Sequence, residues 1–223
     1  MGKMFSFVSK NHKKSGDTWN PLGGKCLHDC KYCWVKVLKK LYPNLAKKYD
    51  GAPHLFPKEF NQKFTKDDFV FVCDMTDLFG YWVPNEMIQQ VLDYLAQSPA
   101  KFLLLTKFPK RYLEFNIPKN CVCGATIESN IDHLITIPIV SRVDAMSQIT
   151  QSKMVSIEPI MDFDLESFVD MICAINPDFV AVGYDNYRNN LSEPELEKTM
   201  KLINILEDKG ITVYTKTLRE KHS

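Results

Sequence analysis

The sequence predicts an α/β fold built mainly of parallel strands, and two features of the chain indicate it. Short runs of apolar and β-branched residues recur, and a polar tip and a helix-like stretch follow most of them. Runs this continuous are typical of strands buried on both faces, as in a parallel sheet flanked by helices. The predicted strands are Phe69–Val72, Phe102–Leu105, Val122–Ile127, Met154–Ile157, Phe179–Val182 and Ile211–Tyr214, and the N-terminal run Phe5–Val8 belongs with them.

Helix signals occupy the segments between these runs. Asn85 begins a stretch with its apolar residues on one side, and Leu165–Ile175 shows the same periodicity. Ser192 and Glu195 have the spacing of a capping box, and Gly210 closes the helix that they introduce. Strands and helices therefore alternate along the chain.

The segment after Cys33 carries a further amphipathic helix, which Pro43 is expected to kink or end. The connection over residues 49–66 contains Pro53 and Pro57 and has no clear period, so we expect a loop or insertion there.

Alternating strands and helices imply right-handed crossovers and a parallel sheet. Six or seven such units fall short of the complete eightfold barrel, which typically needs roughly 250 residues. We therefore expect one domain over residues 1–223, built as an open, partial (β/α)6-type barrel. A doubly wound open sheet is the alternative.

The composition is that of an ordinary globular protein, with 45% hydrophobic and 25% charged residues. No apolar run approaches the roughly 20 residues that span a bilayer, and the first residues lack a secretory pattern, so we expect no membrane association. The seven cysteines are an odd number, and three of them lie close together. This usage favours a reducing compartment, and we expect a cytoplasmic protein.

Positive charge is concentrated in the first third of the chain. Residues 1–66 hold 14 Lys and Arg against 4 Asp and Glu, although the net charge of the whole chain is only +1. Positive charge around the opening of an active site attracts anionic substrates, including nucleic acid. Alternatively, these lysines form the solvated face of a helix. The lysines concerned are Lys10, Lys13, Lys14, Lys36, Lys39, Lys40, Lys47 and Lys48.

Cys26, Cys30 and Cys33 form a C-x3-C-x2-C motif on a glycine-led loop, and this is the most informative feature of the chain. Three thiolates can each hold one iron of a cubane cluster, which leaves the fourth iron open for chemistry. Two other interpretations fit the same spacing: a zinc site of three thiolates completed by His28, or structural cysteines that bind nothing.

The motif resembles the signature of the radical SAM superfamily, in which S-adenosylmethionine (SAM) occupies the open iron. The resemblance implies that Cys26, Cys30 and Cys33 bind a [4Fe–4S] cluster and that Tyr32, the aromatic residue before the third cysteine, lies near the adenine. It also implies a partial (β/α)6 barrel, in agreement with the strand pattern.

Polar residues follow the predicted strands, and ligands of parallel α/β folds bind at that end of the sheet. Such a ring suits the amino group, carboxylate and ribose of SAM, although Asp, Ser, Thr and Asn at strand ends also cap helices. Lys107 and Glu158 are candidates for catalysis, because neither is a usual cap and a buried charge needs a partner. The candidates for SAM contact, besides Tyr32, are Asp74, Thr76, Asp77, Thr126, Glu128, Ser129 and Ser156. Asp185, Asn186 and Lys216 complete the ring.

Four further segments extend the resemblance over most of residues 18–218. They are Thr18–Pro21, Asp74–Phe79, Leu104–Pro109 and Ser156–Ile160. In this order they look like a small phage- and prokaryote-associated radical SAM family of uncharacterised function, distantly similar to spore photoproduct lyase. That enzyme repairs DNA, so the analogy points to a nucleotide or nucleic-acid substrate.

We therefore expect an enzyme in which the reduced cluster cleaves SAM to a 5′-deoxyadenosyl radical that abstracts hydrogen from a substrate. This chemistry implies an electron donor of the flavodoxin or ferredoxin type. Cys73 precedes a strand tip and is a candidate to donate a hydrogen atom to a substrate radical. The alternative from another class is a non-catalytic zinc or iron–sulfur module that organises a basic nucleic-acid-binding surface.

Overall fold

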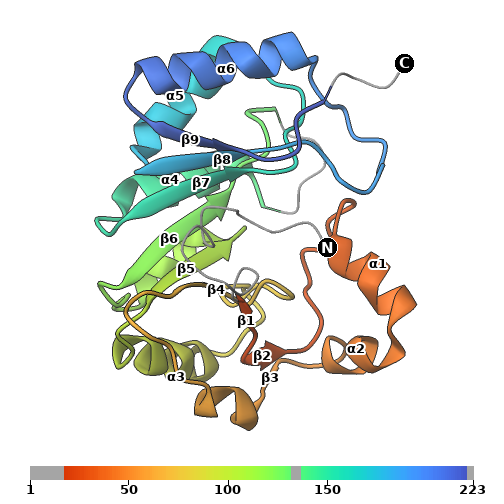
Figure 1. Cartoon of the computed structure of the whole chain (residues 1–223), viewed down its shortest axis with the longest axis vertical. Helices are drawn as coiled ribbons and strands as arrows, with labels where there is room; N and C mark the ends of the chain where they lie inside the picture. The colour runs from red at the N-terminus through yellow and green to blue at the C-terminus, as the bar shows by residue number, and fades with distance from the viewer. Residues whose placement is uncertain (1–17, 132–136, 220–223) are drawn as a thin grey trace.

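The computed structural model describes residues 18–131 and 137–219, which form a seven-stranded sheet flanked by helices (Figure 1). Every neighbouring pair of strands in this sheet is parallel. The strands, in their order across the sheet, are β1 (Thr18–Trp19), β4 (Phe69–Val72), β5 (Lys101–Thr106), β6 (Cys121–Thr126), β7 (Lys153–Ile157), β8 (Phe179–Val182) and β9 (Thr212–Thr215).

The order of the strands across the sheet follows their order in the chain. A doubly wound sheet instead reverses its strand order at a switch point, so this topology favours the partial barrel over that alternative. Within the described residues, β1 and β9 are the two edges of the sheet, and the barrel is open. The predicted α/β fold with mainly parallel strands is confirmed.

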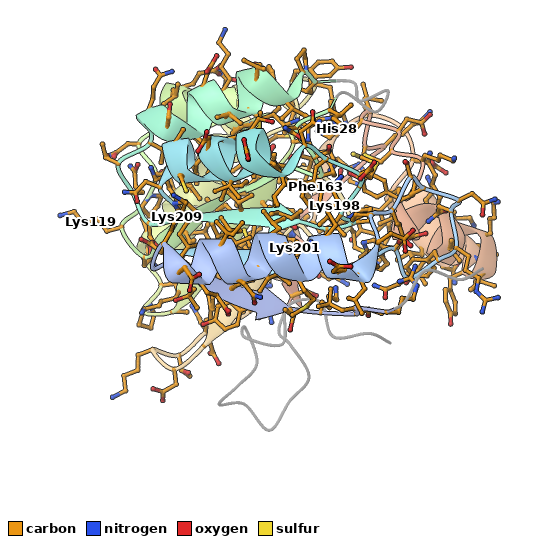
Figure 2. The ribbon with its side chains drawn as sticks, turned by 90° about the horizontal axis from the view of Figure 1, so that it is seen from above. His28, Lys119, Phe163, Lys198, Lys201 and Lys209 are labelled. Atoms are coloured by element: carbon orange, nitrogen blue, oxygen red, sulfur yellow. The ribbon has the colours of Figure 1, made fainter. Side chains whose placement is uncertain are left out.

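Four helices cover one face of this sheet. In Figure 1, α5 and α6 lie above the strands and α3 lies below them. Lys198 on α6 lies beside Phe163, with Nζ 4.9 Å from the ring centre (Figure 2). The helices are α3 (Asn85–Ala96), α4 (Ile139–Gln148), α5 (Leu165–Ile175) and α6 (Leu196–Asp208).

Side chains alternate between the two faces of each strand. Val70, Val72 and Leu104 pack into the main core on the helix side. Phe71 and Leu103 belong to a separate cluster, which lies on the opposite, inner face. Both faces of the central strands are therefore apolar, as the continuous runs predicted.

The segment between β1 and β4 forms a small unit, and its helices α1 (Trp34–Leu41) and α2 (Pro43–Lys48) lie to the right in Figure 1. Its short strands β2 (Leu22–Gly23) and β3 (His54–Leu55) pair antiparallel. The helix predicted after Cys33 ends at Leu41, and Pro43 begins a second helix, as its missing N–H allows. The elements of this unit are α1 (Trp34–Leu41), α2 (Pro43–Lys48) and, within the expected loop over residues 49–66, β3 and the 3-10 helix η2 (Pro57–Asn61).

Two sequence predictions differ from the structure or lie outside it, and some elements were not predicted. Helix α6 begins at Leu196 with Glu195 as its N-cap, so the capping box assigned to Ser192 was wrong. The sequence analysis did not predict β1 or α4. The predicted strand Phe5–Val8 lies outside the described residues.

Across residues 18–131 and 137–219, no helix combines the length and hydropathy that a membrane-spanning helix requires.

Candidate functional site

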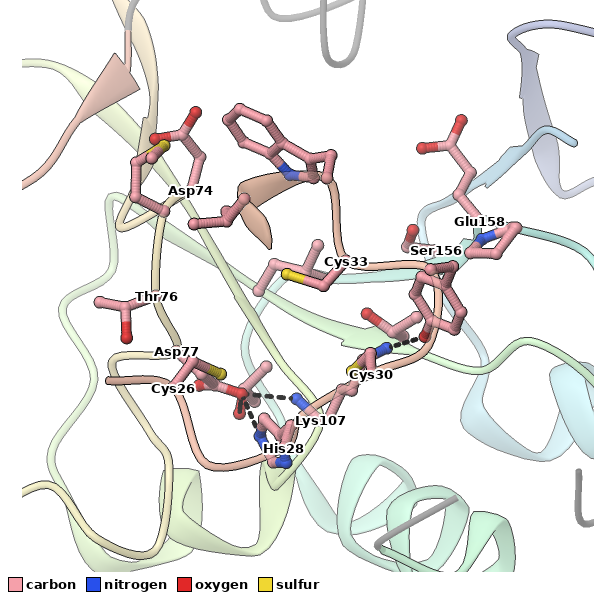
Figure 3. A pocket seen from close by; sticks show the side chains of 18 of the residues that line it. Cys26, His28, Cys30, Cys33, Asp74, Thr76, Asp77, Lys107, Ser156 and Glu158 are labelled. Atoms are coloured by element: carbon pink, nitrogen blue, oxygen red, sulfur yellow. Dashed lines mark hydrogen bonds and ion pairs between the residues drawn. The ribbon is translucent and has the colours of Figure 1, made fainter. Parts of the chain in front are cut away.

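A pocket lies at the carboxyl ends of the strands, between the inner face of the sheet and the loop that precedes α1 (Figure 3). Side chains of the inner face form its floor, among them Phe71, Leu105, Thr126 and Ser156. Every strand from β4 to β9 contributes a residue from its carboxyl half or from its tip. Parallel pairing brings these tips together, which is why residues far apart in the sequence share one cavity.

Cys26, Cys30 and Cys33 all line this pocket. Gly24 fixes the start of their loop, because its φ of 99° and the 2.7 Å between an added Cβ and the Ala52 carbonyl oxygen leave room only for glycine. Hydrogen bonds from the backbone N–H groups of Gly24 and Lys25 to Lys48 and Gly51, each 3.0 Å, anchor the loop to the segment after α2. The structure thus places the three sulfur-bearing side chains at one end of a cavity.

The thiols of this loop suit a metal cofactor that supplies positive charge. Burial, with the nearby Asp77 carboxylate, raises the pKa of Cys26 to about 12, and burial also raises the pKa of Cys30. A bound metal reverses such shifts and deprotonates its thiol ligands. Among the described residues, no three His, Cys, Asp or Glu side chains are grouped to hold a metal ion. Three thiolates this close in the sequence could hold a cluster or, with a fourth ligand, a zinc ion.

Asp77 is a buried anchor for the cysteine loop. Its Oδ2 lies 2.7 Å from His28 Nε2, and it accepts hydrogen bonds of 2.9 Å from the Thr106 hydroxyl and from the Lys107 backbone N–H. The Phe79 backbone N–H donates to Oδ1. Burial raises the pKa of Asp77, but these bonds and the charge of His28 outweigh it and lower the pKa. Asp77 therefore ties the loop to β4 and β5.

His28, the fourth ligand in the zinc interpretation, faces this anchor. Its Nε2 is engaged by Asp77, and its ring packs against Trp82 at a centroid distance of 4.9 Å. His28 Nδ1 is buried, and no atom of the described residues lies in hydrogen-bonding position to it. His28 lines the pocket together with Cys26, Cys30 and Cys33.

A buried charge network supports the next part of the pocket wall. Lys107 Nζ lies 2.7 Å from Glu128 Oε1 and 2.5 Å from the Tyr32 hydroxyl, and the Tyr32 hydroxyl also donates to Glu128. Arg142, on α4, donates from Nη1 to Glu128 Oε2 at 2.9 Å and to the Thr126 carbonyl oxygen at 2.8 Å. The side chains of Glu128 and Arg142 are both 0% exposed.

Two cations therefore surround one carboxylate. Burial raises the pKa of Glu128, but the charges of Lys107 and Arg142 outweigh it and lower the pKa to about 2. Glu128 remains ionised, and it holds Lys107 and the ring of Tyr32 in the pocket wall. Lys107 Nζ lies 5.0 Å from the centre of that ring, at its hydroxyl edge.

The opposite end of the pocket contains Glu158, next to Ser156 (Figure 3). Glu158 Oε2 lies 3.8 Å from Lys216 Nζ. Glu158 Oε1 is buried, and the described part of the chain offers it no hydrogen-bond partner. Burial raises the pKa of Glu158, and Lys216 only partly offsets this.

The structure brings most of the predicted site residues together. Asp74 accepts a hydrogen bond of 2.6 Å from Asn20, and burial raises its pKa. Glu128 and Ser129 do not line the pocket; the Ser129 hydroxyl instead donates to the Asp162 carbonyl oxygen at 2.6 Å. The pocket-lining candidates are Cys26, Cys30, Tyr32, Cys33, Cys73, Asp74, Thr76, Asp77, Lys107, Thr126, Ser156 and Glu158.

The lysines near the cysteine loop have local partners. Lys36 lies 2.7 Å from Asp29, and Lys39 pairs with Asp50. Lys31 Nζ donates to the Asn190 carbonyl oxygen at 3.2 Å, which connects the loop to the segment after β8. These contacts favour a solvated helix face as the interpretation of Lys36 and Lys39. Lys10, Lys13 and Lys14 lie outside the described residues.

Sequence reasoning missed Arg142 and Asn20. Arg142 lies in a helix that was not predicted, and a lone arginine gives no sign of burial. Asn20 donates to Asp74, 54 residues away, through a contact that only the pairing of β1 with β4 creates.

Comparisons with known proteins found a matching family model and a structure with a similar fold. A family model described as "Protein of unknown function (DUF5131)" matches residues 11–216. No curated protein matches the chain. A structure of a spore photoproduct lyase mutant with bound AdoMet and dinucleoside spore photoproduct is similar, with a TM-score of 0.52 and 10% sequence identity. The similarity covers 74% of this chain and 55% of that one, so this chain spans about half the length of that protein. The predicted distant likeness to spore photoproduct lyase is confirmed for the fold.

Proposed function

This chain belongs to the family described as "Protein of unknown function (DUF5131)", and we propose that it is a radical SAM enzyme. One observation carries the proposal: all three cysteines of the C-x3-C-x2-C motif line a single pocket at the carboxyl edge of an open parallel sheet. Tyr32 and the polar strand tips line the same pocket. A non-catalytic metal module has no need of such a cavity. The AdoMet bound in the spore photoproduct lyase structure, which shares the fold, also supports SAM as the ligand.

The residues present fit the two cofactors. Cys26, Cys30 and Cys33 would hold a [4Fe–4S] cluster, with one iron left free of protein ligands. When both groups are bound, they supply one-electron cleavage of SAM, followed by hydrogen abstraction from a substrate. The protein contributes orientation and the cavity in which the reaction would take place.

Some polar side chains are available to a ligand in the pocket, whereas others position neighbouring residues. Asp74 and Thr76 suit the ammonium group of SAM, and the hydroxyls of Thr126 and Ser156 suit its ribose. Lys107 and the Tyr32 ring form one wall. Asp77, Glu128 and Ser129 act through the protein, because their oxygens are already engaged by other residues.

We propose Cys73 as the hydrogen-atom donor to a substrate radical. Its side chain is buried and lines the pocket, and burial raises its pKa. The thiol therefore keeps its hydrogen at neutral pH, which is the form that can donate a hydrogen atom. Its backbone has a φ of 58°, uncommon for a residue other than glycine. Such conformations cluster at functional sites.

The test is anaerobic iron–sulfur reconstitution followed by addition of dithionite and SAM, with 5′-deoxyadenosine measured by chromatography. We expect the wild type to form 5′-deoxyadenosine and Cys30→Ala to form none. Cys173→Ala is the matched control, because Cys173 lies on α5 away from the pocket, and it should behave as the wild type. A protein that takes up zinc and forms no cluster would refute the proposal and support the metal module. A flavodoxin- or ferredoxin-type protein is the proposed physiological donor, and it should replace dithionite.

A further inference from the structure

The end of the pocket around Glu158 contains an unsatisfied polar group. Glu158 Oε1 is buried, and residues 18–131 and 137–219 provide no hydrogen-bond partner for it. The side chain of Glu158 is 14% exposed, and its other oxygen lies 3.8 Å from Lys216 Nζ. Leaving a buried acceptor unpaired is unfavourable, so such an atom indicates a donor that arrives with a ligand.

The fold keeps space for this carboxylate. Gly183 follows β8, and a Cβ at this position would lie 2.9 Å from Glu158 Oε1 and 3.1 Å from Lys216 Cβ. The backbone of Gly183 is not in the left-handed region, so its lack of a side chain serves space rather than conformation. Glu158 and Lys216 come from β7 and β9, on either side of this glycine.

The chemistry of the pair selects a neutral ligand with a donor beside an acceptor. A carboxylate accepts, an ammonium group donates, and their charges balance, so a ligand with a net charge gains little here. A cyclic amide or imide presents an N–H next to a C=O on one edge and can bond both side chains at once. Proteins read nucleobase edges by the same pairing of donor with acceptor.

Aromatic side chains complete the site. Tyr184 and Tyr187 line the pocket after β8, and Trp34 and Phe71 line it elsewhere. The Tyr184 hydroxyl is 2.8 Å from Thr199 Oγ1 on α6, so the ring is held in position. A flat, partly apolar ring with a polar edge, such as a nucleobase, suits these walls.

We propose that Glu158 and Lys216 form the substrate subsite of the pocket and bind the amide or imide edge of a nucleobase. This inference rests on the proposed function, which assigns SAM to Asp74, Thr76, Thr126 and Ser156 and leaves Glu158 and Lys216 for the substrate.

The test is equilibrium binding of uridine to the full-length protein after anaerobic reconstitution, with SAM present and no reductant. Uridine carries the N–H and C=O edge, whereas 3-methyluridine lacks that N–H and is the matched probe. We expect saturable uridine binding that is at least about tenfold weaker for 3-methyluridine, because the buried acceptor is again left unpaired.

Variants of the pair sharpen the test. Glu158→Leu and Lys216→Met should each weaken uridine binding at least about tenfold. Glu158→Gln keeps an acceptor and should stay within about threefold of the wild type, whereas recognition of an ammonium ligand would need the negative charge. Glu207→Leu, at an exposed position on α6, is the control and should bind as the wild type.

The outcomes separate this inference from the proposed function. Formation of 5′-deoxyadenosine by a protein that binds no uridine, or that binds 3-methyluridine equally well, would overturn the inference alone. Equal losses in Glu158→Gln and Glu158→Leu would overturn recognition of a neutral edge. Uridine binding that depends on Glu158 and Lys216, in a protein that never forms 5′-deoxyadenosine, would support the subsite and refute the proposed chemistry. The comparison of uridine with 3-methyluridine uses the wild-type protein. It therefore tests the inference even if a variant fails to fold.

Discussion

Arg142 should be one of the most important side chains for stability, although it is a charged residue. It is fully buried and donates to Glu128 Oε2, to the Thr126 carbonyl oxygen and to the Ile137 carbonyl oxygen, at 2.8–3.2 Å. Arg142→Met removes the charge and all of these hydrogen bonds while keeping an unbranched chain. Glu128 then loses one of its two cationic partners inside the protein.

The expected cost follows from this burial. Removing one partner of a buried ion pair costs about 3–5 kcal/mol, and we expect about 3 kcal/mol because Lys107 still pairs with Glu128. The pKa of Glu128 agrees with this in direction, because the charges of Lys107 and Arg142 outweigh the effect of burial and lower it to about 2. A loss of this size lowers the melting temperature by about 6–12 °C in a chain of this length.

The assay is urea unfolding followed by circular dichroism, with Arg188→Met as the control at an exposed position. The double variant Glu128→Gln with Arg142→Met should lose at least about 1 kcal/mol less than the sum of the single losses, because the two side chains are in direct contact. A loss below about 1 kcal/mol for Arg142→Met, similar to that of the control, would refute the buried network.

Three further predictions follow from the same contacts. The pKa of Glu128 is lowered to about 2, so its contribution to the free energy of unfolding is complete above pH 4.5 and disappears as the pH falls toward 2. In Glu128→Gln, the free energy of unfolding should therefore fall less steeply between pH 4.5 and pH 2. An unchanged pH dependence in this range would contradict the prediction. Gly24→Ala should lower the free energy of unfolding by about 1–3 kcal/mol and reduce iron uptake during reconstitution. Gly51 also has a positive φ but has open space around it, so Gly51→Ala should leave iron uptake intact. Equal iron uptake by the two variants would count against the loop geometry. Asp77→Ala should lower the free energy of unfolding by about 3 kcal/mol, because the buried groups that donate to Asp77 lose their acceptor. Asp93→Ala, at the surface, should lower it by less than about 1 kcal/mol in the same unfolding assay.

The fold was largely predictable because its strands are buried on both faces. Runs such as Phe102–Leu105 are apolar throughout, and each coincides with an observed strand to within one residue at each end. The two-residue strand β1 is too short to give a pattern. Helix α4 was missed because the buried Arg142 interrupts its apolar face, and an arginine is normally expected at the surface.

The site was predictable in its composition but not in its contacts. Parallel strands end at one edge, so polar tips such as Thr126 and Glu158 were expected to meet, and both line the pocket. Which tip residues face inward depends on tertiary partners. Glu128 and Ser129 turn to Arg142 and to the Asp162 backbone, through contacts that no local pattern records.

We propose that the cysteine loop holds a cluster with an iron open to SAM. The most direct measurement is the electron paramagnetic resonance spectrum of the reconstituted, dithionite-reduced protein at low temperature, recorded with and without SAM. We expect a [4Fe–4S]⁺ signal that shifts on addition of SAM and that is absent in the variant in which Cys26, Cys30 and Cys33 are all alanine. A cluster signal that SAM leaves unchanged, or a wild-type protein that forms no cluster signal, would contradict it.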